Sequence, residues 1–106
     1  MNPQKQADFS HYGKSFQESL ASLILEDRSF ADRIQEVLET EYFELKYLQV
    51  FVDRVFDYRD KYSVHPSEKI MTTVLRTEIS EEPEPVQKQT RDFFARIHNT
   101  QTEDSE

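Results

Sequence analysis

The sequence has 106 residues, which is enough for one domain with a single hydrophobic core. Its formal net charge is −8, so its surface as a whole repels phosphate and direct binding of nucleic acid is not expected. Eight Phe and five Tyr favour a folded chain, and a single Gly argues against a β fold, because tight hairpin turns need glycine. The absence of Cys excludes disulfides and thiolate metal sites.

The hydropathy pattern argues against membrane contact. No apolar run reaches the roughly 18 residues of a membrane-spanning helix. The polar start, MNPQKQ, does not have the pattern of a signal peptide. We therefore expect a cytoplasmic protein.

The predicted helical domain spans residues 15–98, between a flexible N-terminal tail (1–14) and a polar tail or truncated linker (99–106). Ser15-Phe16-Gln17-Glu18 matches a capping box, in which a hydroxyl and a carboxylate satisfy free amides at a helix start. Asp27 or Ser29 can cap a second helix. The apolar residues predicted to face the core are Phe16, Leu20, Leu23 and Ile24 in the first helix, and Phe30, Ile34, Val37 and Leu38 in the second.

The longest predicted helix runs from about Leu45 to Tyr62 and is apolar on two sides. One stripe consists of Leu45, Leu48, Val52, Val55 and Phe56, and a second stripe consists of Tyr47, Val50, Phe51 and Tyr58. A helix that is apolar on two sides is usually central, so the first interpretation places both stripes in the core. The alternative is that the second stripe binds a partner protein. The possible protein-binding residues are then Tyr47, Val50, Phe51, Arg54 and Tyr58.

Two further helices complete the predicted domain. Pro66 breaks the long helix, and Ser67 can cap a fourth helix. An acidic, proline-broken loop follows, and Pro85 suits the first turn of a fifth helix. We therefore predict an all-α fold, a compact bundle of about five short helices. The inner residues are Ile70, Val74, Leu75 and Ile79 in the fourth helix, and Val86, Thr90, Phe93, Phe94 and Ile97 in the fifth.

No pattern predicts catalysis, a metal site or a cofactor site. Gly13-Lys14-Ser15 resembles the end of a phosphate-binding loop, but the first glycine of that motif is missing. His11, His65 and His98 have no second ligand at metal-binding spacing. The many carboxylates of residues 36–60 fit solvent-facing helix surfaces.

The order of several helix and turn segments carries a resemblance to a known family. These segments are SFQESL (15–20), LILEDRSF (23–30), EYF (41–43), FDYRDKY (56–62) and VHPS (64–67). Together they resemble the N-terminal domain of DnaB-like replicative helicases, particularly of phage versions, over roughly residues 16 to 97. None of the segments is a catalytic motif, and the specificity of the match comes from their order and spacing.

The resemblance implies a DnaB-helicase N-terminal-domain-like fold that sits in a collar above a RecA-like ATPase ring. Its implied role is to help assemble the hexamer and to dock primase or the helicase loader, in the cytoplasm of a bacterial host if a phage encodes it. ATP and Mg²⁺ would bind in the ATPase domain, which this sequence does not include, so no cofactor is expected here. The helical hairpin that makes collar contacts in this family is also not included, so the oligomeric state stays open.

Two other classes of function are compatible with the sequence. A free-standing acidic regulator, either a decoy of the helicase head that binds a replication protein or a mimic of DNA, is motivated by the −8 charge. A small helical enzyme is the third class, and it would require a polar pocket that short amphipathic helices do not predict.

Overall fold

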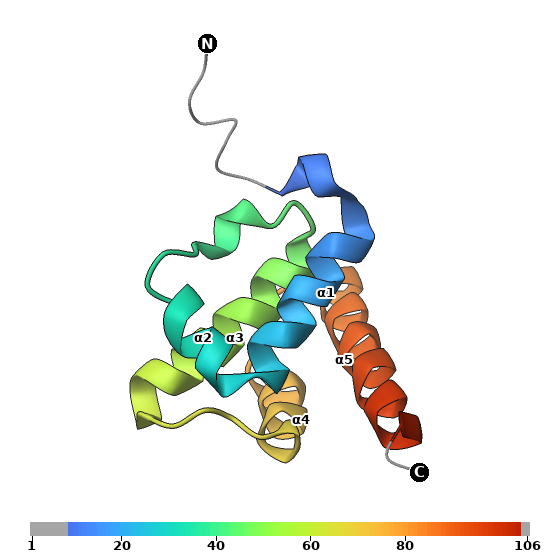
Figure 1. The fold of residues 1–106 in the computed structure, drawn as a ribbon. Helices are drawn as coiled ribbons and strands as arrows, with labels where there is room; N and C mark the ends of the chain where they lie inside the picture. Colours follow the sequence, from blue (N-terminus) through green and yellow to red (C-terminus); the bar gives the residue numbers. More distant parts are fainter. Residues whose placement is uncertain (1–8, 105–106) are drawn as a thin grey trace.

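The computed structural model describes residues 9–104 of the chain, with side chains described up to residue 98. Over this range the chain forms five α-helices and two short 3-10 helices, with no strand (Figure 1). The predicted all-α bundle of about five helices is confirmed. In chain order the elements are η2 (Ser10–Tyr12), α1 (Gly13–Glu26), α2 (Arg28–Ile34), η3 (Thr40–Tyr42), α3 (Lys46–Tyr62), α4 (Glu68–Thr77) and α5 (Glu84–Asp104).

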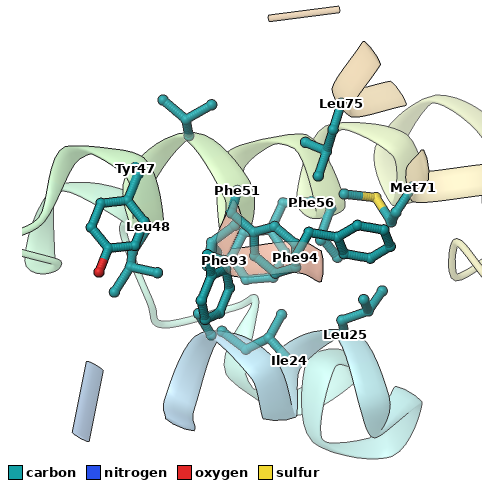
Figure 2. Close-up of a cluster of buried hydrophobic side chains, with 14 of the residues drawn as sticks. Ile24, Leu25, Tyr47, Leu48, Phe51, Phe56, Met71, Leu75, Phe93 and Phe94 are labelled. Carbon is teal, nitrogen blue, oxygen red and sulfur yellow. The ribbon is translucent and has the colours of Figure 1, made fainter. Parts of the chain in front are cut away.

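The core surrounds α3, which packs against α1, α4 and α5. Phe51 of α3 and Phe93 of α5 are fully buried and meet edge to face, with ring centroids 5.1 Å apart. Figure 2 shows Ile24 of α1 on one side of these rings and Met71 of α4 at the far end of the cluster. Both apolar stripes of the helix therefore contribute to the core, as the first interpretation of the sequence proposed. The buried residues of α3 are Tyr47, Leu48, Val50, Phe51, Val52, Val55 and Phe56.

Local capping chemistry sets several helix ends as predicted. The Asp27 carboxylate accepts a hydrogen bond from the Phe30 amide at 3.0 Å, at the start of α2. The Ser67 hydroxyl accepts one from the Ile70 amide at 3.1 Å, at the start of α4. Pro85 is the second residue of α5, where its missing amide hydrogen removes no helical bond.

The predicted N-terminal boundary is wrong, because ordered structure begins before residue 15. Phe9 donates its amide hydrogen to the Tyr42 carbonyl at 2.8 Å, and its ring lies 5.3 Å from that of Phe43 between centroids. Gly13 has a φ of 85°, a conformation that favours glycine, and α1 starts at this residue. Ser15 therefore lies inside α1 and does not form the predicted capping box. Residues 1–8 of the predicted tail lie outside the described residues.

The C-terminal boundary is also displaced. Helix α5 continues to Asp104, so residues 99–104, which were predicted as a polar tail or linker, are helical. After Ile97 the sequence has no apolar residue to continue the helical pattern, which is why the pattern alone placed the end too early, and it has no glycine or proline to end the helix there. The last two residues of that predicted tail lie outside the described residues.

The buried face of α1 differs from the predicted one by about one residue. The side chains that face the core include Gln17, Ala21 and Ile24, whereas Phe16 and Leu23 are exposed. Gln17 can be buried because two backbone groups satisfy its side-chain amide. The amide oxygen accepts a hydrogen bond from the Glu44 amide at 2.9 Å, and the amide nitrogen donates to the Phe9 carbonyl at 3.2 Å. The predicted inner position of Val37 is wrong as well, since this side chain is 68% exposed.

Candidate protein-binding site

Three large apolar side chains lie exposed along α1 and its N-cap. Tyr12 is 61% exposed, Phe16 is 42% exposed and Leu23 is 39% exposed. Their spacings of four and seven residues place them on one helix face, and the rings of Tyr12 and Phe16 lie 4.9 Å apart. We refer to Tyr12, Phe16 and Leu23 as the α1 row. Tyr12 and Phe16 are in contact, and Leu23 lies about two helical turns further along the same face. Exposed apolar side chains that share one face mark a binding surface more often than scattered ones do.

A groove of about 560 Å³ lies beside the α1 row, between α1 and α5. The two helices splay apart toward their C-terminal ends (Figure 1). Phe93 lies at the base of the groove, and Leu23 belongs to both the groove and the α1 row. We refer to this feature as the α1–α5 groove, and it is lined by Ser15, Glu18, Ser19, Ser22, Leu23 and Glu26 of α1 and by Phe93 and Ile97 of α5.

A hydrogen-bonded cluster at the edge of the groove joins three helices. Arg96 of α5 donates to both carboxylate oxygens of Glu18 of α1, each at 3.0 Å. The Tyr47 hydroxyl of α3 donates to the same carboxylate at 2.5 Å. These bonds hold α1 and α5 at a set separation, so the groove is formed before any ligand arrives.

The electrostatics of this cluster follow from its geometry. The hydrogen bond from Arg96 is the main cause that lowers the pKa of Glu18, so the carboxylate stays ionised. Burial first, and then the hydrogen bond to Glu18, raise the pKa of Tyr47 to about 12. The same Glu18 partner raises the pKa of Arg96. The cluster is therefore a fixed ion pair with a neutral phenol donor at neutral pH.

A second, acidic hollow of about 350 Å³ adjoins the groove at Glu26, which lines both. It lies where the end of α1 meets the start of α4, and Pro66, Ser67 and Glu68 complete its lining with Leu25. The Glu68 carboxylate also lies 2.8 Å from Nδ1 of His98. The groove lining therefore mixes three apolar residues with serines and carboxylates, and the hollow at α4 adds Glu68.

The predicted protein-binding residues do not form a surface. Tyr47 is 7% exposed, Val50 is 6% exposed and Phe51 is fully buried, so these three side chains belong to the core and cannot reach a partner in this fold. Arg54 is partly exposed and lies 3.4 Å from Asp57 and 3.8 Å from Glu78. Tyr58 is partly buried, and its ring lies 4.6 Å from that of Tyr62. The alternative interpretation, in which the second stripe binds a partner protein, is therefore wrong for Tyr47, Val50 and Phe51.

The apolar pattern of the sequence does not predict this candidate surface. It places Tyr12 in the flexible tail, and Phe16 and Leu23 in the core. The signal was nevertheless present, because Gln17, Ala21 and Ile24 also follow helical spacing and leave Phe16 and Leu23 on a neighbouring face. Which of these two faces packs into the core is decided by the groups that bond Gln17, the Glu44 amide and the Phe9 carbonyl, and both of these lie outside α1.

A second polar cluster, centred on Arg59, has a structural role. Arg59 pairs with Asp32 of α2 and donates to Gln35 at 2.7 Å. Its guanidinium also lies 2.7 Å from Nδ1 of His65, whose Nε2 lies 2.7 Å from the Leu25 carbonyl. The hydrogen bond from Arg59 is the main cause that lowers the pKa of Asp32. The cluster therefore joins α2, α3 and the segment before α4 to the end of α1.

Within residues 9–104, no group of His, Cys, Asp or Glu side chains is arranged to hold a metal ion. In the same part of the chain, no helix has both the length and the apolar character needed to cross a membrane. No protein-family model matches the sequence, and neither the curated proteins nor the solved structures provide a significant match.

Proposed function

We propose that this chain is a non-catalytic domain that binds other proteins, with the role of the N-terminal head of a DnaB-like replicative helicase, particularly one of phage type. In this role it contacts other helicase subunits and docks primase or the helicase loader in the cytoplasm of a bacterial host. The observation that carries the binding role is the α1 row beside the α1–α5 groove. The ordered resemblance over residues 16 to 97 supports the helicase assignment, and an all-α fold is what that resemblance implies.

The physical case for binding is the cost of leaving the α1 row in water. Each buried Å² of apolar surface contributes about 25 cal/mol, so covering Tyr12, Phe16 and Leu23 gives a partner several kcal/mol of favourable free energy before association costs. Aromatic residues are also enriched among the side chains that dominate protein interfaces. The Glu18–Arg96 ion pair fixes the groove in advance, which lowers the entropy lost on binding.

The proposal is tested by titrating the chain with the primase encoded in the same genome, using isothermal calorimetry. We expect binding, and we expect Leu23→Glu to weaken it at least tenfold, because a carboxylate would be desolvated within an apolar contact. Val37→Glu is the matched control, since Val37 is an exposed apolar residue outside the α1 row. Circular dichroism should show that both variants retain their helicity, because neither side chain is buried.

Two results would contradict the proposal. If primase, the loader and a full-length helicase all fail to bind the wild-type chain, the helicase role is wrong. If Val37→Glu weakens binding as much as Leu23→Glu does, added negative charge explains the loss, and the α1 row is not the binding surface.

A further inference from the structure

We infer that the α1–α5 groove binds an amphipathic helix of a partner protein, and that the apolar residues of this helix are followed by a Lys or Arg. This inference rests on the proposed function and specifies the chemistry of the partner. It follows from two features: the shape of the apolar section of the groove, and the charge at its α4 end.

The shape of the groove suits a helix. Ser15, Ser19 and Ser22 follow one another at spacings of four and three residues, so they form a line along α1, and Glu26 continues it. From Ser15 to Glu26 this line extends about 16 Å, or three helical turns. Serine side chains are short, so the backbone of a third helix can approach α1 closely while its apolar side chains reach Leu23 and Ile97.

The opposite wall provides the apolar contact. Phe93 and Ile97 of α5 are four residues apart and share one face. Phe93 is fully buried beneath the groove, so Ile97, which is partly buried, is the residue of this face that a partner can contact. Leu23 faces this wall from α1. An incoming helix with apolar side chains at positions i and i+3 or i+4 would place them beside Leu23 and Ile97.

The α4 end of the groove selects for a cation. Glu26 and Glu68 are two of the five residues that line the acidic hollow there, and no Lys or Arg lines it. At the other end, Lys14 precedes Ser15, and Arg96 is bonded to Glu18. A partner helix therefore gains most when its Lys or Arg lies at the α4 end, which also sets the direction in which the helix binds.

Charge also argues against a second copy of this chain as the occupant. Two chains that each carry a charge of −8 repel one another, and their approach would place more carboxylates near Glu26 and Glu68. A partner of opposite charge is attracted by the same field. We therefore assign the groove to a basic helix of a different protein.

The inference is tested by selecting binders of the full chain from a displayed library of 18-residue amphipathic helices, randomised at the apolar positions and at both flanks. We expect the enriched peptides to carry Lys or Arg at one flank only. Selected peptides are then synthesised and titrated against the wild-type chain and its variants. Glu26→Lys should weaken binding about fivefold, since it replaces an attractive charge pair with a repulsive one. Glu36→Lys, an equal charge change in the exposed segment after α2, should weaken binding less than twofold.

Ser22→Trp provides a second variant, because an indole at this position fills the groove without changing the charge. We expect it to abolish peptide binding. The inference is overturned if no enriched peptide depends on Ser22, if the enriched flanks are acidic or uncharged, or if the chain dimerises through the groove in sedimentation equilibrium. Binding of primase that Ser22→Trp leaves intact would overturn this inference alone, whereas failure of every replication protein to bind would overturn the proposed function alone.

Discussion

The stability of this fold is predicted to fall at alkaline pH because of Tyr47. Burial, followed by the hydrogen bond to Glu18, raises the pKa of Tyr47 from 10.0 to about 12 in the folded chain. In the unfolded chain the phenol has its ordinary pKa, so the folded state binds this proton more tightly. Because the folded pKa is the higher one, the stabilisation is fully present below about pH 10 and is lost as the pH rises toward 12.

The size of the effect follows from the shift. One pKa unit corresponds to about 1.4 kcal/mol, so a shift of about two units contributes up to roughly 2.7 kcal/mol. At pH 11, halfway between the two pKa values, about 1.4 kcal/mol of this contribution has been lost. Small domains are stable by only about 5–15 kcal/mol, so a loss of this size is readily measured.

The assay is guanidinium unfolding, followed by circular dichroism at about pH 8 and pH 11, for the wild-type chain and for Tyr47→Phe. The wild-type chain should lose about 1.4 kcal/mol more between the two pH values than the variant does, because Phe has no proton to release. Tyrosinate absorbance provides an independent check, since the chain contains five Tyr and no Trp. Equal losses in the two proteins, or an absorbance change for Tyr47 centred near pH 10, would refute the reasoning.

Three further predictions concern the core, a helix cap and a histidine. Phe93→Ala should lower the free energy of unfolding by about 3–5 kcal/mol in guanidinium titrations, because Phe93 is fully buried against Phe51; a loss below about 1 kcal/mol would place this ring outside the core. Asp27→Ala should cost about 1 kcal/mol through loss of the cap of α2, whereas Ser29→Ala should cost less than about half of that. His65 should be the neutral tautomer with its proton on Nε2, because the Leu25 carbonyl can only accept and Arg59 can only donate. ¹⁵N NMR shifts of the ring that instead placed the proton on Nδ1 would show this network to be wrong.

The features that the sequence predicted correctly depend on local chemistry. The two-sided apolar pattern of residues 45–62 indicated a central helix, and α3 is that helix. Ser67 was predicted as a cap, and Asp27 was one of two candidates with Ser29, because short polar side chains before an apolar periodic run favour that role. Pro85 indicated the first turn of α5 in the same way.

The features that the sequence did not predict depend on contacts between distant residues. Gln17 occupies the core face of α1 only because the Glu44 amide and the Phe9 carbonyl satisfy its side chain. Hydropathy alone places Phe16 on the core face of α1, whereas this side chain is exposed in the structure. The same displacement hid the candidate site, since Leu23 was counted as core. The α1–α5 groove depends in turn on how far apart Glu18 and Arg96 hold two helices, and no local pattern encodes that separation.

The most direct test of the binding surface is an NMR footprint of the ¹⁵N-labelled chain with primase from the same genome. We expect the largest amide shift changes in α1 and α5, at residues such as Ser19, Leu23 and Ile97, which line the groove. Changes confined to α2 and the segment that follows it, with the amides of α1 and α5 unmoved, would show that the α1–α5 groove is not the binding surface.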